Sequence, residues 1–517
     1  MKRLTVTLVS STALTILAAP ALAADGADIV QDVCGACHQP DANGDYSRID
    51  AARRTPEGWE MNIERMVRNY GVHLSDQDRA TVIRYLADTR GLSIEETEGY
   101  RYILEREPFA QDQGPDQLMT DTCGRCHSYA RVALQRHSAE DWEKLLHFHL
   151  GQFPALEYQA LARDRDWWVV AQGDVLTTLT QRYVMGEAPE KSDADLSGTW
   201  QIAGRQPGRG DYHGTMTVTS DGDAYAVTAD LIFADGAAEQ QTGRAILYGA
   251  GEWRASLTGG GAELRQVMAL RADGTLEGRW FHTDQSTLGG RIMAARGDDP
   301  RILSVSPDHI RNGETTEIRI IGTGLTGAPA LPDGLTAEVV SQDTTAVVLR
   351  VTADAEAPAG RGPVSVGDAA LENGLAVFGA LDHITVEPPL TYSRIGDGGG
   401  PIAAQPAVFD AIGWLNGPDG QPGTEDDIRV GTVHADWRTE NFDEAAAEMK
   451  DAQFTGTIGP TGIFSPAAAG PNPERPMRTN NAGNLSVIAT VTDGNTTLEG
   501  KAHLYATVQR FVDPPIR

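Results

Sequence analysis

The sequence predicts a multidomain fold in which an all-α N-terminal domain is followed by three all-β domains, each a barrel or a sandwich. The chain has 517 residues, which at about 150 residues per domain corresponds to three or four domains. Segments with helical periodicity occupy residues 24–190. From Leu196 onward, short alternating strands are separated by Asp-Gly and Gly-Gly turns, which is typical of antiparallel β structure.

The charge balance is strongly acidic. Asp and Glu total 72 against 43 Lys and Arg, which gives a net charge of −29. Nucleic acids and anionic membrane surfaces bind basic footprints, so we expect no nucleic acid and no membrane as partner. The 40% of hydrophobic residues and 22% of charged residues are ordinary for a globular protein.

Residues 1–23 have the pattern of a secretory signal peptide. Lys2 and Arg3 precede a largely apolar stretch from Leu4 to Leu17, and Ala21 and Ala23 are the small residues of a cleavage site. The apolar run is shorter than the roughly 20 residues that a membrane span needs. We therefore expect export into an oxidising compartment, where free thiols are a liability.

All four cysteines occur in two copies of one motif. The copies are Cys34-Gly-Ala-Cys37-His38 and Cys123-Gly-Arg-Cys126-His127, and Cys-x-x-Cys-His is the attachment signature of haem c. Two thiols on one helical turn can reach the two vinyl groups of a porphyrin, and the next residue places an imidazole against the iron. A zinc site would need further clustered ligands, and a thioredoxin-like dithiol would not need the histidine. The sequence thus predicts two covalently bound haem c groups, with His38 and His127 as axial ligands of the iron.

The second axial ligands are expected on two helices that share a pattern. Trp59 and Trp142 each begin a Trp-Glu segment of an amphipathic helix, and the seventh residue after each tryptophan is Met66 in the first copy and His149 in the second. Met66 is therefore the expected ligand of the first haem iron and His149 that of the second.

Four alternatives to these ligands stay open. Met61 and His73 compete with Met66 for the first iron. His147, which lies on the other side of its helix, and His137 compete with His149 for the second iron.

Different ligands would give the two haems different potentials. Methionine ligation raises a haem potential relative to bis-histidine ligation. We expect the bis-histidine haem to accept electrons first and the histidine/methionine haem to pass them on. With both irons six-coordinate, neither would be open to oxygen or peroxide.

Turn and linker patterns set the domain boundaries. An all-α diheme cytochrome c domain spans residues 24–190, with further helices expected after Ser75, around Glu98–Arg106 and near Asp166–Tyr183. An antiparallel β-barrel or sandwich domain spans 194–298. The last domain, 384–517, is predicted to be a β-sandwich with a long irregular stretch from Gly396 to Asp436.

Residues 300–382 form the remaining module. It contains Glu317-Ile-Arg-Ile-Ile-Gly-Thr-Gly-Leu325, which resembles the IPT/TIG immunoglobulin-like family, and it has the right size for that β-sandwich.

The combination of these features resembles the α-subunit family of quinohemoprotein amine dehydrogenase. Two Cys-x-x-Cys-His units lie 89 residues apart (Cys34 to Cys123), the Trp-Glu-x-x-Ile/Leu-x-x-Met/His pattern repeats, and three β modules follow, one of them IPT-like. The haem motifs alone are not family-specific, whereas this combination is. The resemblance covers essentially the whole mature chain.

The resemblance implies a periplasmic heterotrimer that oxidises primary amines to aldehyde and ammonia. The oxidising cofactor would be cysteine tryptophylquinone on a small γ subunit, and a β-propeller β subunit would complete the complex. The haems of this chain would pass electrons to an external cytochrome c or cupredoxin. The quinone needs cysteine, and haem attachment uses all four cysteines here, so we expect this chain to carry no catalytic residue of its own.

Two other functions are compatible with the sequence. A diheme cytochrome c peroxidase would keep one iron five-coordinate or weakly ligated. The chain could also be the electron-transfer subunit of another periplasmic dehydrogenase, with the β modules serving as a docking surface.

Overall fold

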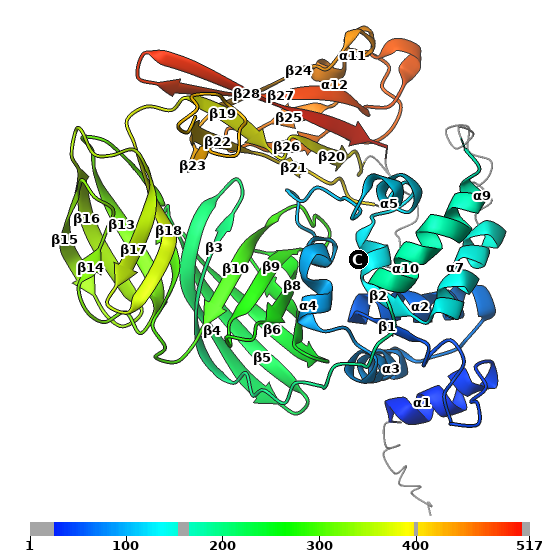
Figure 1. The fold of residues 1–517 in the computed structure, drawn as a ribbon. Coiled ribbons are helices and arrows are strands. Elements are labelled where there is room, and N and C mark those ends of the chain that lie inside the picture. The colour runs from blue at the N-terminus through cyan, green and yellow to red at the C-terminus, as the bar shows by residue number, and fades with distance from the viewer. Residues whose placement is uncertain (1–24, 153–164, 398–401, 509–517) are drawn as a thin grey trace, which may run out of the picture.

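The structure is a computed structural model that describes residues 25–152, 165–397 and 402–508. The predicted signal peptide lies outside the described residues. Figure 1 shows a helical region on one side, a β-barrel beside it, a β-sandwich beyond the barrel and a second β-rich part across the top. In the described part of the chain, no helix is long and apolar enough to cross a membrane.

The N-terminal region is mostly helical. Its helices are α1 (Gly26–Asp32), α2 (Pro56–Tyr70), α3 (Asp76–Thr89), α4 (Ile94–Thr97), α5 (Gln117–Thr122), α6 (Ala130–Ala133), α7 (Ala139–Gln152), α9 (Trp167–Val170) and α10 (Leu176–Arg182). It also contains an antiparallel pair of short strands, β1 (Ala52–Arg54) and β2 (Gln135–His137). The prediction of an all-α domain missed this pair, because three-residue strands carry no alternating pattern.

Capping residues explain where the two predicted ligand helices begin. At the start of α2, Thr55 Oγ1 accepts a hydrogen bond from the Gly58 N–H, and Pro56 occupies the first helical turn. Helix α2 ends at Gly71, whose φ of 69° is a left-handed conformation that favours glycine. Ser138 caps α7 in the same way by accepting from the Asp141 N–H at 3.1 Å.

Two of the predicted helices are divided in the structure. The segment expected around Glu98–Arg106 is a 3₁₀ helix over Glu98–Ile103, preceded by α4. The closing helix expected near Asp166–Tyr183 has a π-helical segment, Ala171–Val175, between α9 and α10.

The second part of the chain is a closed eight-stranded barrel. Its strands are β3 (Gly198–Gln206), β4 (Gly210–Asp221), β5 (Ala224–Phe233), β6 (Ala238–Tyr248), β7 (Glu252–Gly259), β8 (Ala262–Leu270), β9 (Leu276–His282) and β10 (Gly289–Ala295), and β10 pairs with β3 to close it. Trp200, Trp253 and Trp280 are fully buried in its core. An eight-stranded barrel has an interior that side chains can fill, so this domain is a packed core.

The third part is a sandwich of two four-stranded sheets. One sheet has the order β11-β13-β16-β15 and the other β12-β18-β17-β14. The strands are β11 (Arg301–Ser306), β12 (His309–Arg311), β13 (Thr315–Thr323), β14 (Pro329–Ala330), β15 (Leu335–Gln342), β16 (Ala346–Ala353), β17 (Gly360–Val366) and β18 (Ala369–Phe378). Alternate residues such as Ile318 and Ile320 point into the core between the sheets.

The last part combines three sheets with two short helices. The sheets have the orders β19-β22-β23, β20-β28-β27-β24 and β21-β26-β25. The elements are β19 (His383–Glu387), β20 (Leu390–Arg394), β21 (Ala407–Val408), β22 (Asp410–Leu415), β23 (Ile428–Val433), β24 (Asp436–Asn441), α11 (Glu444–Met449), α12 (Asp451–Phe454), β25 (Gly456–Ile458), β26 (Ile463–Pro466), β27 (Gly483–Asp493) and β28 (Thr496–Thr507). The prediction of an irregular stretch from Gly396 to Asp436 was wrong for β21, β22 and β23.

Buried charges join the helical region to the barrel. Arg101 lies between Glu105, at 3.1 Å, and Glu252 of β7, at 2.6 Å, and all three side chains are nearly inaccessible to solvent. Glu252 also contacts Arg254 at 2.8 Å, and Arg254 reaches Glu57 of α2. The position of the helical region against the barrel is therefore set by paired charges and by apolar packing.

Candidate haem sites

Each Cys-x-x-Cys-His motif follows a short helix. The first motif follows α1 and forms a 3₁₀ turn over Cys34–Ala36, in which the His38 N–H donates to the Cys34 carbonyl at 2.9 Å. The second follows α5, whose last turn is closed by the Cys123 N–H donating to the Met119 carbonyl. Both turns place two cysteines and a histidine on one short piece of chain, as covalent haem attachment requires.

The second site brings the rings of His127 and His149 close together, tilted against each other. Their ring centres lie 6.5 Å apart, at an interplanar angle of 53°. The Nδ1 of His127 donates to the Ser128 carbonyl at 3.0 Å, and the Nδ1 of His149 donates to the Leu145 carbonyl at 2.8 Å. A carbonyl oxygen only accepts, so both Nδ1 atoms carry the proton and each Nε2 carries the lone pair that binds a metal.

This arrangement fits a haem iron between the two rings. Two imidazoles bound to one metal through Nε2, at a metal–nitrogen distance of about 2 Å, need ring centres about 6 Å apart. Burial lowers the pKa of His127, which favours the neutral ring that acts as a ligand. The donor set at this site is therefore suited to bis-histidine ligation.

The alternatives at the second site are placed differently. His137 is buried, and its Nε2 accepts a hydrogen bond from Arg54 Nη2 at 2.9 Å, so its lone pair is already in use. Burial and the charge of Arg54 lower the pKa of His137 to about 3. His147 is exposed and lies edge-on to Trp168. The geometry favours His149 over both histidines.

The first site has a less complete set of contacts. The Nδ1 of His38 donates to the Ser47 carbonyl at 2.8 Å, which again leaves Nε2 as the ligating nitrogen. Met66 is half-buried on α2. Among the described residues, no hydrogen bond reaches its sulfur. No described contact joins Met66 to His38, so the pairing of these two residues remains a prediction.

The alternatives at the first site are also placed differently. The Met61 sulfur accepts from Arg65 Nη2 at 3.3 Å and from Arg131 Nη2 at 3.2 Å. Its lone pairs are thus directed at two cations and not at an iron. His73 is exposed. Both observations favour Met66.

A zinc site is not supported by the described residues. Burial raises the pKa of Cys123 to about 12, which disfavours its thiolate form. In the described ranges, no group of three or more His, Cys, Asp or Glu residues is arranged to hold a metal ion.

A charged cluster around Glu96 was missed from the sequence. Arg53 of β1 and Arg136 of β2 both contact Glu96, Arg53 at 2.7 Å and Arg136 at 3.1 Å. Each arginine lies six residues before the tryptophan of its ligand helix, Trp59 or Trp142. Extending the Trp-Glu repeat toward the N-terminus would have found this pair.

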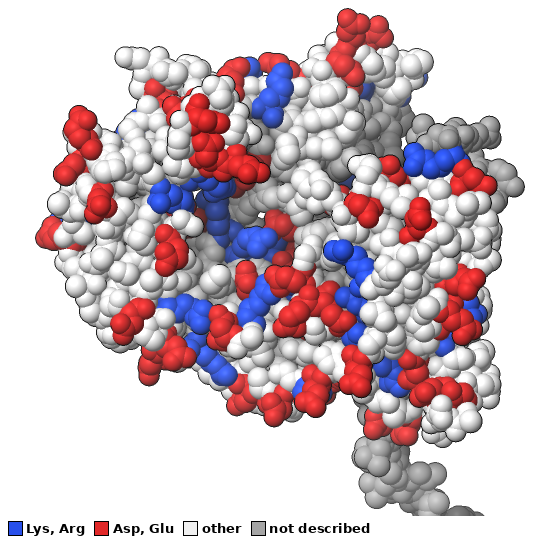
Figure 2. Space-filling model, in the orientation of Figure 1, with Lys and Arg blue, Asp and Glu red and all other residues white. Residues whose placement is uncertain are grey.

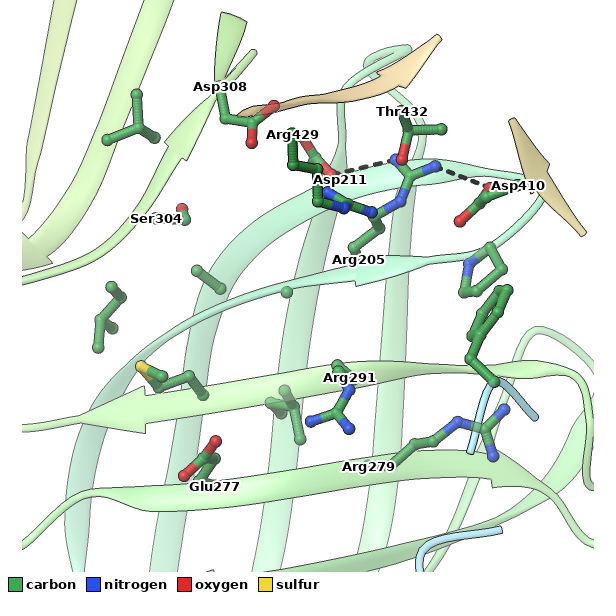
Figure 3. A pocket seen from close by; sticks show the side chains of 18 of the residues that line it. Arg205, Asp211, Glu277, Arg279, Arg291, Ser304, Asp308, Asp410, Arg429 and Thr432 are labelled. Atoms are coloured by element: carbon green, nitrogen blue, oxygen red, sulfur yellow. Dashed lines mark hydrogen bonds and ion pairs between the residues drawn. The ribbon is translucent and has the colours of Figure 1, made fainter. Parts of the chain in front are cut away.

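A cavity of about 810 Å³ lies where all four parts of the chain meet. Figure 2 shows it as a hollow in which basic and acidic side chains come together. In Figure 3, Arg205 of the barrel lies between Asp211 and Asp410, at 3.3 Å and 3.0 Å. The residues that line this cavity include no cysteine. We interpret the cavity as a junction held by paired charges.

Models of one protein family match along the chain. They describe the quinohemoprotein amine dehydrogenase α subunit: its haem-binding domain matches residues 24–189, its domain II residues 193–297, its domain III residues 299–379 and its domain IV residues 384–516. A search of curated proteins found no match.

Solved structures give only weak similarities. A redesigned β-barrel is 16% identical, with a TM-score of 0.18, and the match covers 20% of this chain and 92% of that one. Drosophila N-cadherin EC1-3 is 11% identical, with a TM-score of 0.19, and the match covers 62% and 91% of the two chains. These scores carry no argument about function. The four family matches, which follow one another over the haem motifs and the three β-rich parts, decide the identity: the chain belongs to the quinohemoprotein amine dehydrogenase α-subunit family.

Proposed function

We propose that this chain is the diheme electron-transfer subunit of a periplasmic amine dehydrogenase. It would take electrons from cysteine tryptophylquinone on a small γ subunit during the oxidative deamination of primary amines, and deliver them to an external cytochrome c or cupredoxin. A β-propeller β subunit would complete the complex. Haem c, when bound, supplies one-electron transfer.

The observation that carries this proposal is the pairing of His127 and His149. Their rings lie 6.5 Å apart, and each has its Nδ1 proton engaged by a carbonyl. Fixing the tautomer through Nδ1 orients the ring and makes Nε2 a better ligand. Two such histidines would close both axial positions of one iron, which suits electron transfer and leaves no position for a peroxide substrate.

The first site would hold its haem through Cys34, Cys37 and His38, with Met66 as second ligand. Histidine/methionine ligation gives a higher potential than bis-histidine ligation. The first haem would therefore be the exit of the relay and the second haem its entrance, so that the step between them is downhill.

The partner subunits are inferred from the family and from the cysteines. The four cysteines of this chain all lie in haem motifs, so a quinone that needs cysteine has to come from another polypeptide. The net charge of −29 would favour an electron acceptor with a basic docking patch, mainly by raising the rate of association.

Substitution of the two distal ligands tests the relay. In redox titrations of the mature holoprotein, we expect Met66→Leu to abolish the higher potential and His149→Gln to abolish the lower one. Met61→Leu and His147→Gln are the matched controls on the same helices, and each should retain two haem waves. Because the Met61 sulfur accepts from Arg65 and Arg131, only His147→Gln is expected to keep the potentials themselves unchanged. If Met61→Leu abolishes a potential that Met66→Leu retains, the assignment of Met66 is wrong. The same comparison between His147→Gln and His149→Gln tests the assignment of His149.

Purification of the untagged native complex tests the partners. A small polypeptide that stains for quinone should co-elute with this chain, together with a larger third subunit. A chain that purifies alone and whose ferric haem is high-spin and reacts with peroxide would contradict the proposal and favour a peroxidase. Co-elution with a dehydrogenase that lacks a quinone-bearing chain would favour another electron-transfer complex.

A further inference from the structure

Three arginines of the helical region have no carboxylate partner among the described residues. Arg54 of β1, Arg65 of α2 and Arg131 of α6 are called the arginine cluster below. Arg54 donates to Gln135 Oε1 and His137 Nε2, and Arg65 and Arg131 both donate to the sulfur of Met61. Arg65 also approaches Asn62 Oδ1 at 3.4 Å. In the described part of the chain, every one of these partners is a neutral group.

Burial makes this lack of counter-charge costly. Arg54 is 7% exposed, and among the described residues its Nε has no hydrogen-bond partner. Burial and the charge of Arg65 lower the pKa of Arg54 to about 9, and Arg65 and Arg131 are half-buried. Buried cations are normally paired. The chain carries 72 acidic residues, yet among the described residues no ion pair joins an acid to Arg54, Arg65 or Arg131.

Two members of the arginine cluster adjoin predicted haem ligands along the chain. Arg131 follows His127 by four residues, and its charge acts on that ring. Arg65 directly precedes Met66. The Nη2 atoms of Arg65 and Arg131 lie 3.3 Å and 3.2 Å from the same Met61 sulfur, so the two cations are held together between the sites.

The position also limits what can supply the negative charge. A partner protein could not reach the buried Arg54 between β1 and β2. Each haem carries two propionate carboxylates that lie within its own site. The planar guanidinium group binds a carboxylate through two parallel hydrogen bonds, which a lysine cannot reproduce.

We propose that the arginine cluster binds haem propionates. Arg65 and Arg131 would bridge the two haem sites, and Arg54 would add a third positive charge beside them. This inference rests on the two-haem assignment proposed above. Positive charge beside an iron stabilises its reduced state, so the arginine cluster would raise the potentials of the relay.

The test uses the full chain with both haems attached. Arg54→Gln, Arg65→Gln and Arg131→Gln are compared by redox titration and by the propionate-bending band in resonance Raman spectra. We expect each variant to shift the one-electron equilibrium of at least one haem tenfold or more toward the ferric form. This corresponds to a reduction potential that is lower by 59 mV or more. Each variant should also shift the propionate-bending band. Lysine at the same position should restore most of the potential but not the band.

Arg68→Gln is the matched control. Arg68 lies on the same helix as Arg65, its side chain is 51% exposed, and it is paired with Glu64. It should change neither readout.

Unchanged potentials and propionate bands in all three glutamine variants would overturn the inference. If a glutamine variant retains no haem, the lysine variant at the same position is measured instead. A propionate band that is unshifted in the lysine variant counts against the inference. Failure of the unsubstituted chain to retain two haems would instead overturn the proposed function.

Discussion

Arg53 and Arg136 lie directly opposite each other at the centre of the β1–β2 pair, and Glu96 contacts both. They occupy equivalent positions of the internal repeat, six residues before Trp59 and Trp142. An antiparallel pair centred on equivalent residues has local two-fold symmetry. The two copies of the repeat are thus joined through matching segments, with one carboxylate as the shared counter-ion.

Replacing Glu96 should weaken this joint. Glu96→Gln leaves two nearly buried arginines without counter-charge, and we expect it to lower the free energy of unfolding by about 3 kcal/mol. Denaturant unfolding followed by haem absorbance measures the effect. Glu95→Gln, the exposed neighbour, is the control and should be nearly neutral. If the two substitutions lower the free energy of unfolding equally, Glu96 does not hold β1 and β2 together.

Acid should loosen the contact between the helical region and the barrel. Burial alone would raise the pKa of Glu252, but Arg101 and Arg254 lower it from 4.5 to about 2. A carboxyl group with a lowered pKa stabilises the folded state above its unfolded pKa and loses that contribution as the pH falls toward its folded pKa. We expect a loss of about 3 kcal/mol between pH 4.5 and about 2.

Unfolding measured across this pH window checks the assignment. Glu252→Gln should be less stable at neutral pH and show a smaller pH dependence in the window. Glu263→Gln, an exposed acid on the neighbouring strand β8, should keep the dependence of the unsubstituted protein. An unaltered slope in Glu252→Gln would assign the acid sensitivity to other carboxyl groups.

The two tryptophans should act on separate haems. Trp59 Nε1 donates to the Arg90 carbonyl at 3.1 Å, and Trp142 Nε1 donates to the Tyr183 carbonyl at 3.0 Å. Trp142→Phe removes that bond and some packing, at a cost of about 1–3 kcal/mol. We expect it to perturb the absorbance of the second haem and Trp59→Phe that of the first. Each variant is the control for the other, and identical spectral changes would contradict separate sites.

The interdomain cavity offers a further test. Arg205 joins the barrel to the C-terminal part through Asp410, and Asp211 accepts a hydrogen bond from Ser306 of the sandwich at 2.7 Å. Because Arg205 is about one-third exposed, Arg205→Leu should cost only about 1–2 kcal/mol. The expected readout is faster proteolysis between the domains. Arg244→Leu, which removes an exposed barrel pair with Asp221, should leave the cleavage rate unchanged.

The starts of the ligand helices depend on local interactions. Thr55 and Ser138 act as caps because a hydroxyl followed by a helical segment satisfies N–H groups within three residues. Closure of the barrel depends instead on β3 pairing with β10, two strands at opposite ends of the domain. Short alternating segments such as Thr215–Thr219 and Thr275–Phe281 are recognisable from the sequence, whereas the pairing of β3 with β10 leaves no local signal. The sequence therefore predicted a barrel or a sandwich without deciding between them.

The sequence alone determined three things: the two haem-attachment motifs, the order of helical and β-rich parts, and the resemblance to a family. Each of these depends on residue types at short spacing. Tertiary structure alone decided that His149 faces His127, that Arg54 occupies the lone pair of His137, and that two arginine cations point at the Met61 sulfur. The physical reason is distance along the chain. A side chain becomes a ligand or a structural residue according to neighbours that only folding brings within about 3 Å.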